Sequence, residues 1–207
     1  MATAAAPTAP DLLRRVVRLQ VLTIAWMSVE AIVALGAAWT ARSSALLGFG
    51  GDSAIELFSA LIVLCRFRSK SDSADAEKLA ARVAGGLLFI VAAFVIVSSG
   101  LSLIGYREPQ PSFAGIILLI AAAVGMPWLA REKRKLATQI ASVSLSTDAA
   151  ESALCGYLSW IALAGLLTNA VFQKSWADPV AALLLVPLVV KEGWSAMRAS
   201  RPGCQCC

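Results

Sequence analysis

Apolar segments of helical length alternate with short polar segments along the whole chain. They are rich in Ala, Leu, Val, Ile and Gly and lack the strict alternation of a membrane strand, so we predict helices. Six are predicted: Leu19–Ala41, Ala45–Cys65, Val83–Gly105, Phe113–Ala130, Ser146–Asn169 and Pro179–Val190. The first five are long enough to cross a hydrocarbon core roughly 30 Å thick. The sixth is shorter, and it spans only if Asp178 lies in the protein interior and the Lys191 side chain extends to the interface.

The composition supports the same interpretation. Hydrophobic residues make up 58% of the chain and charged residues 15%, and the mean hydropathy is +0.75. A soluble domain averages about half apolar and a quarter charged residues. We therefore predict an integral membrane protein of the all-α class, a six-transmembrane-helix bundle in the lipid bilayer with no soluble C-terminal domain.

The basic residues predict how this bundle is oriented. The net charge of +5 comes from residues between the apolar segments, so it indicates membrane topology and not nucleic-acid binding. With six spans, only Arg42, Arg107 and Lys174 of the 18 basic residues lie on one side. The run REKRK, residues 131–135, marks the other side between the fourth and fifth spans. Both termini are therefore expected in the cytoplasm.

Acidic residues inside two predicted spans are the clearest functional signal. Asp52 and Glu56 lie four residues apart in the second span, so both carboxylates face the same side of a helix. In the fifth span Asp148, Glu151 and Cys155 stand at i, i+3 and i+7. An acid near the bilayer centre costs roughly 2.5–3.5 kcal/mol on insertion scales. Two helices that both carry this cost indicate a functional site between them.

A metal ion is the ligand that these residue types favour. Two antiparallel helices can supply four ligands near mid-membrane, the number expected for zinc. The predicted set is Asp52, Glu56, Glu151 and Cys155. The thiolate favours Zn²⁺ or Cd²⁺, while the carboxylates keep Mn²⁺ and Fe²⁺ open. Because metal and protons compete for the same atoms, the site predicts an exchange of metal for protons. Gly48, Gly50 and Gly51 would let a neighbouring backbone approach this site closely.

Each of these residues also has a structural interpretation. An acid inside a span can simply pair with a polar group on the next helix, and Cys155 can be a small core residue. Asp148 is expected to cap its helix or form a hydrogen bond, with gating of metal access as the accessory alternative. Glu30 in the first span is expected to hydrogen-bond between helices. Asp178 is expected to cap the sixth helix, with Pro179 at its first position.

The chain ends in three cysteines within four residues. Cys204, Cys206 and Cys207 would capture a soft cation in the cytoplasm and deliver it to the site; the alternative is a frayed tail without a transport role. We expect a disordered cytoplasmic tail over residues 1–18, a transmembrane domain over residues 19–198 and a short Cys-rich cytoplasmic tail over residues 199–207.

Three segments resemble the cation diffusion facilitator (cation efflux) family. They are residues 44–64, 146–155 and 176–198, which are similar to its second, fifth and sixth helices, and the resemblance covers roughly residues 15–200. It implies a six-helix, proton-coupled exporter of divalent metals whose second and fifth helices each carry a ligand pair. Asp52 and Glu56 match one pair. Glu151 and Cys155 occupy the other, where the family usually has His and Asp.

Other departures from the family bear on the partners. REKRK stands where many members have a His-rich loop, and the cytoplasmic metal-binding domain that usually follows the sixth helix is not part of the sequence. The family is usually dimeric, but dimerisation through that domain is not implied, which leaves a homodimer open.

The sequence thus predicts a secondary-active exporter of a Zn- or Cd-like divalent metal and not an enzyme, because it has no histidine and no nucleophile elbow. A bacterial inner membrane is the expected location. The alternative is a membrane metal sensor or chaperone that binds metal without transporting it.

Overall fold

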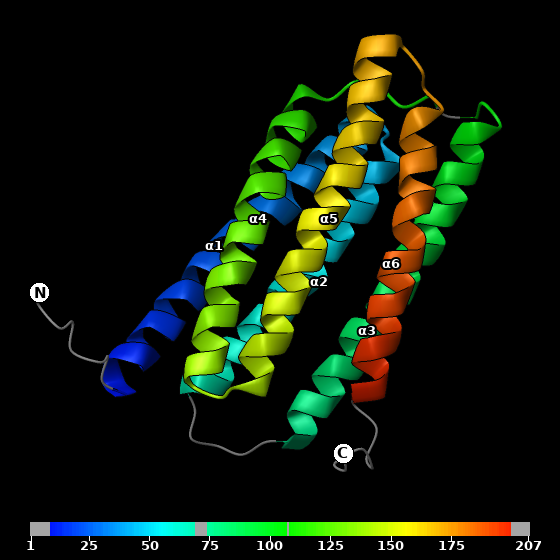
Figure 1. Cartoon of the computed structure of the whole chain (residues 1–207). Helices are drawn as coiled ribbons and strands as arrows, with labels where there is room; N and C mark the ends of the chain where they lie inside the picture. The colour runs from blue at the N-terminus through cyan, green and yellow to red at the C-terminus, as the bar shows by residue number, and fades with distance from the viewer. Residues whose placement is uncertain (1–8, 69–73, 107, 200–207) are drawn as a thin grey trace, which may run out of the picture.

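The protein is a bundle of six long helices, as the apolar pattern predicts. The computed structural model describes residues 9–68, 74–106 and 108–199. Its helices are α1 (Ala9–Ala41), α2 (Ser44–Arg68), α3 (Ala74–Leu103), α4 (Phe113–Gln139), α5 (Val143–Phe172) and α6 (Ala177–Ala199). Successive helices run in opposite directions, so the start of α1 and the end of α6 lie at the same end of the bundle (Figure 1). No strand occurs within these described ranges.

All six helices extend beyond their predicted apolar segments at one end or both, and α3 begins at Ala74 and not at Val83. α1 begins at Ala9, so residues 9–18, which were predicted to belong to a disordered tail, are helical; residues 1–8 lie outside the described part of the chain. α4 continues to Gln139 and includes the REKRK run, which was predicted to separate two helices. α6 is longer than its apolar segment and ends at Ala199. The rest of the predicted Cys-rich tail, residues 200–207, lies outside the described residues.

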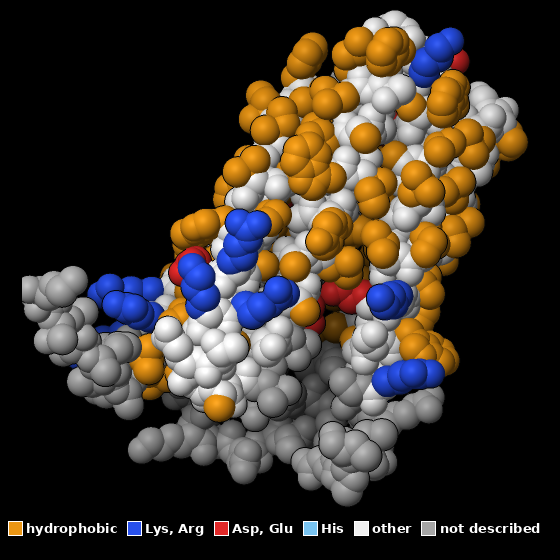
Figure 2. All heavy atoms as spheres, viewed as in Figure 1, with side chains coloured by type: hydrophobic (Ala, Val, Ile, Leu, Met, Phe, Trp, Pro, Cys, Tyr) orange, Lys and Arg blue, Asp and Glu red, His pale blue; other side chains and the backbone are white. Residues whose placement is uncertain are grey.

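The surface of the bundle is that of an integral membrane protein. Among the residues that the structure describes, α1, α3, α4, α5 and α6 are long and apolar enough to cross a membrane. Apolar side chains cover most of the face drawn in Figure 2, whereas Lys and Arg gather mainly at the end that carries the two termini. Large side chains such as Ile32 and Ile104 are about three-quarters exposed. Apolar exposure on this scale suits lipid and not water.

Helix α2 differs from the others because it lies inside the bundle. It packs against α1, α3, α5 and α6, and Leu46 and Phe49 on it are completely buried in the main apolar core. Most side chains from Ser44 to Glu56 are buried, so the neighbours shield this half of α2 and both of its acids, whereas Phe58 and Leu61 further along are 39% and 41% exposed. The site acids are carried by this central helix.

Glycines let α2 approach its neighbours, as predicted. A Cβ atom on Gly50 would lie 2.9 Å from the Ala34 Cβ and 3.0 Å from the Leu35 backbone nitrogen of α1. A Cβ on Gly51 would lie 2.8 Å from a Val91 side-chain carbon of α3. These distances are too short for real Cβ contacts, so α1 and α3 can pack this closely only against glycine. The packing fixes the helix that carries Asp52.

Asp178 caps a different helix from the one predicted. It lies in the first turn of α6, but its carboxylate accepts hydrogen bonds from the backbone N–H groups of Ser44 (2.8 Å) and Ala45 (3.3 Å) and from the Ser43 hydroxyl. Ser43 in turn accepts a bond from the Leu46 N–H at 3.1 Å. The acid therefore satisfies the free donors at the start of α2, the role of an N-cap supplied by another helix.

Candidate metal centre

Three of the four predicted ligands meet in the structure. Asp52 and Glu56 from α2 and Cys155 from α5 each offer one ligand atom, and these atoms all lie within 4.8 Å of one another. The side chains are 4%, 6% and 0% exposed. One metal ion can therefore be reached by two carboxylates and one thiol in the interior of the bundle.

The local sequence explains this geometry. Asp52 and Glu56 are one turn apart on α2, so their side chains lie above one another on one face. α5 packs directly against α2, and Cys155 is a completely buried member of the same core cluster as Phe49. The packing of α5 against α2 therefore brings the Cys155 thiol to the two carboxylates.

Glu151, the fourth predicted ligand, does not join this group. It is half-buried, and its carboxylate lies close enough to interact electrostatically with Glu56 and Asp52. Glu192 of α6 interacts with the same charges, and its Oε2 is buried without a hydrogen-bond partner among the described residues. Figure 2 shows acidic side chains in a recess between α5 and α6. The centre is thus bordered by further acids on the α6 side, of which Glu192 was not predicted.

Asp148 neither caps α5 nor joins the ligand group. α5 begins at Val143 with Ser142 as its N-cap. The Asp148 Oδ2 atom instead forms an ion pair with the Lys133 Nζ atom of α4 at 2.9 Å, with both side chains buried. Lys133 also donates a hydrogen bond to the Ser152 hydroxyl at 2.8 Å, and Ser152 donates to Glu56 Oε1 at 3.0 Å. A buried ammonium group is therefore connected to a candidate ligand through one hydroxyl.

Sequence reasoning missed Lys133 because it belongs to the basic run REKRK. A signal was present, however. The buried face of α4 includes Met126, Leu129 and Ala130 and then Lys133 and Leu136. Lys133 continues the i, i+3, i+4 pattern of that face, which predicts burial for this one basic residue of the run.

Glu30 of α1 is a second acid whose environment differs from the prediction. It is completely buried, and its charge interacts with those of Glu56 and Asp52. Neither carboxylate oxygen has a hydrogen-bond partner among the described residues; the Trp26 indole is near, but the two groups do not reach hydrogen-bonding geometry. The predicted interhelical hydrogen bond is therefore not formed, and Glu30 adds to the acidic character around the centre.

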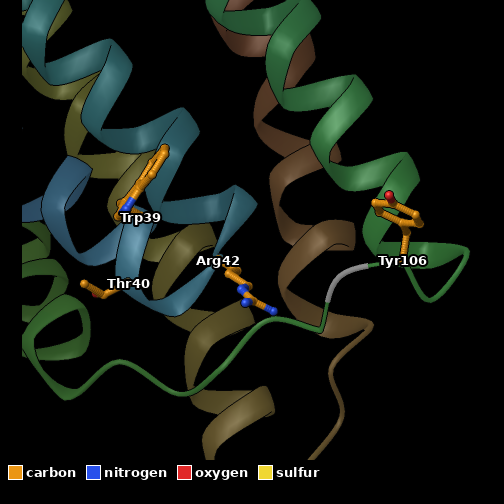
Figure 3. A pocket seen from close by; sticks show the side chains of 4 residues that line it. All are labelled: Trp39, Thr40, Arg42 and Tyr106. Carbon is orange, nitrogen blue, oxygen red and sulfur yellow. The ribbon is translucent and has the colours of Figure 1, made fainter.

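The predicted accessory ligands Cys204, Cys206 and Cys207 are outside the described residues. An open depression at the opposite end of the bundle from the termini is lined by Trp39, Thr40, Arg42 and Tyr106. Figure 3 shows that these four side chains do not converge on a common point, and none of them is a predicted ligand. The candidate chemistry thus lies in the bundle and not in this depression.

A carboxylate and thiol cluster at the centre of membrane-spanning helices is typical of a polytopic membrane protein that handles cations. Residues 21–202 match the model of the cation efflux transmembrane domain, so the chain belongs to the cation efflux family. It is similar to the manganese efflux system protein MneS of Bacillus subtilis (strain 168), with 24% identity over 168 residues. The match covers 77% of this chain and 58% of that relative's length.

Proposed function

We propose that the protein is a secondary-active exporter of divalent transition-metal cations, with Asp52, Glu56 and Cys155 as the ligands of the transported ion. The observation that carries the proposal is the meeting of these three groups within 4.8 Å on two helices of a membrane-spanning bundle. Family membership supports it independently. The metal is the cargo of the protein and not a resident cofactor.

The donor set restricts which metals fit. Two oxygens and one sulfur suit borderline ions better than Mg²⁺ or Ca²⁺, and the thiolate favours Zn²⁺ and Cd²⁺. The similar protein MneS is named as a manganese efflux protein, which supports Mn²⁺ as a further candidate. Fe²⁺ also fits the carboxylates. Three protein ligands leave a position for a fourth, and we assign it to Glu151, which stands one turn before Cys155 on α5. Zn²⁺ is the ion that we expect to bind most tightly.

Proton exchange follows from the same atoms. A carboxylate or thiolate that binds a metal cannot hold a proton, so each arrival of a metal ion releases protons and each departure takes them up. Asp52, Glu56 and Cys155 are therefore sufficient to couple the movement of the metal ion to that of protons. We also propose the bacterial inner membrane as the location. A cytoplasmic position of both termini is supported by the basic residues, which gather mainly at the end of the bundle where α1 begins and α6 ends (Figure 2).

The test is transport by the purified full chain in sealed proteoliposomes. Zn²⁺, Cd²⁺, Mn²⁺ and Fe²⁺ are offered separately, with and without an imposed pH gradient. Asp52→Asn is expected to abolish uptake of every ion. Glu132→Gln, which neutralises a surface acid paired with Lys135, is expected to leave uptake unchanged.

Three results would each contradict a different part of the proposal. If Asp52→Asn transports as well as the parent, the ligand assignment is wrong. If the parent binds metal but moves none, the protein is a sensor or chaperone. A transport rate that does not respond to the pH gradient would remove the proton exchange alone.

A further inference from the structure

The bundle holds a buried cation of its own beside the candidate metal centre. Among the described basic residues, Lys133 alone is completely buried. Its ammonium group lies 2.9 Å from Asp148 Oδ2 and 2.8 Å from Ser152 Oγ. A buried lysine is costly unless its charge is paired and hydrogen-bonded, and here both requirements are met. The buried Lys133 ammonium group is therefore expected to have a role in the neighbouring metal centre.

The Ser152 hydroxyl makes a different hydrogen bond from three other serines in the middle of helices. Ser28, Ser53 and Ser159 donate their hydroxyl protons to the backbone carbonyl four residues earlier on their own helix. This is the usual choice of a helical serine away from water. Ser152 instead donates across the helix interface to Glu56 Oε1 at 3.0 Å.

Lys133 explains the difference. Its ammonium group occupies a lone pair of the Ser152 oxygen, and a hydroxyl that accepts a strong charged donor is a better donor itself. Asp148 holds the ammonium from the other side. The hydroxyl proton is thereby directed to Glu56, and Oε1 of that carboxylate is held in place.

We propose that Lys133 is a positioning residue for the metal centre: held by Asp148, it acts through Ser152 to fix the Glu56 carboxylate in its ligating orientation. Three helices thereby cooperate in one ligand, because Lys133 lies on α4, Ser152 on α5 and Glu56 on α2. The inference deepens the proposed transport function and rests on it.

The experiment separates this role from a purely structural ion pair. Ser152→Ala keeps the pair of Lys133 and Asp148 but cuts its connection to Glu56. The double variant Lys133→Met with Asp148→Asn removes both charges together and so leaves no uncompensated buried charge. Ser28→Ala is the matched control, since it removes a helical hydroxyl that binds only its own backbone.

Equilibrium binding of Zn²⁺ and of Mn²⁺ is measured on the full chain in detergent, together with transport and the melting temperature. Ser152→Ala and the double variant are each expected to raise the dissociation constant and the KM roughly tenfold, with little change in maximal rate, because a hydrogen bond to a charged ligand is lost. A variant that combines Ser152→Ala with the double variant should have the same dissociation constant as either alone, because both changes break the same connection to Glu56. Ser28→Ala should bind as the parent does.

Three results overturn the inference. If the double variant binds metal as tightly as the parent, Lys133 serves only to pair Asp148. If Ser152→Ala binds as the parent does, or if the combined effects are additive, the connection to Glu56 does not position the ligand. If the parent itself binds no divalent metal, both the proposed function and this inference are wrong. If the parent binds metal and the variants bind it equally well, only the role of Lys133 is wrong.

Discussion

Removal of the Asp178 carboxylate tests how α2 is held in place. In the structure this group accepts bonds from two backbone N–H groups of α2 at 2.8 and 3.3 Å and from the Ser43 hydroxyl. The side chain is 1% exposed, so water cannot replace it in a truncated variant. Asp178→Ala therefore leaves the first donors of the central helix without partners.

The magnitude follows from these contacts. Loss of an N-cap costs about 0.5–2 kcal/mol, and each donor left unsatisfied in a buried environment costs about 1–3 kcal/mol. Because the structure around the lost carboxylate can partly relax, we expect Asp178→Ala to lower the free energy of unfolding by about 2–4 kcal/mol. For a chain of this size that corresponds to a fall of roughly 5–10 °C in the melting temperature. Asp178→Asn keeps one acceptor oxygen, so about half of this loss is expected.

The assay is thermal unfolding of the full chain in detergent, followed by circular dichroism. Ser112→Ala is the matched comparison, because Ser112 caps α4 through a single bond from the Gly115 N–H at 3.1 Å. It should cost only about 1 kcal/mol. The reasoning is refuted if Asp178→Ala melts no lower than Ser112→Ala.

Three further predictions concern other contacts. Gly50→Ala should destabilise the bundle by about 1–3 kcal/mol, since the new Cβ would lie 2.9 Å from an α1 side chain, whereas Gly36→Ala, with nothing within 4 Å, should be neutral or slightly stabilising; equal melting temperatures would contradict this. Cys155→Asp should shift transport from Zn²⁺ and Cd²⁺ toward Mn²⁺ in proteoliposomes, and an unchanged order of metals would remove the thiol from the site. Asn169→Ala should cost about 1 kcal/mol in thermal unfolding because the bond from its amide to the Pro109 carbonyl, 3.1 Å long, is lost; no loss would show that water replaces the amide.

The number and order of the helices could be predicted because each apolar segment is long enough to be recognised alone. The helix ends could not be predicted in the same way. Charged residues end an apolar segment, but a helical backbone continues through them when they are good helix formers. Arg14 and Arg15 at the start of α1 and the REKRK run at the end of α4 are such cases.

The part of the candidate site that lies on one helix could be predicted from the sequence. The spacing of Asp52 and Glu56 follows from the helical period, and Cys155 joins them in the structure. Glu151 shows the limit, because the period of one helix does not determine how far each of its turns lies from the neighbouring helix, and Glu151 is outside the group of atoms within 4.8 Å of one another. Lys133 and Asp178 show another limit: their partners lie on other helices, so their roles depend on packing that no local pattern contains.

The shielded position of α2 has a consequence for how the protein is made. As α2 leaves the translocon, Asp52 and Glu56 each add an insertion cost of about 2.5–3.5 kcal/mol near the bilayer centre. α1 can lower this cost because its residues Ala34 and Leu35 pack closely against Gly50 of α2 and cover one side of that helix. We therefore expect the two helices to enter the bilayer as a hairpin, and a ribosome-bound chain that lacks α1 should insert α2 less completely.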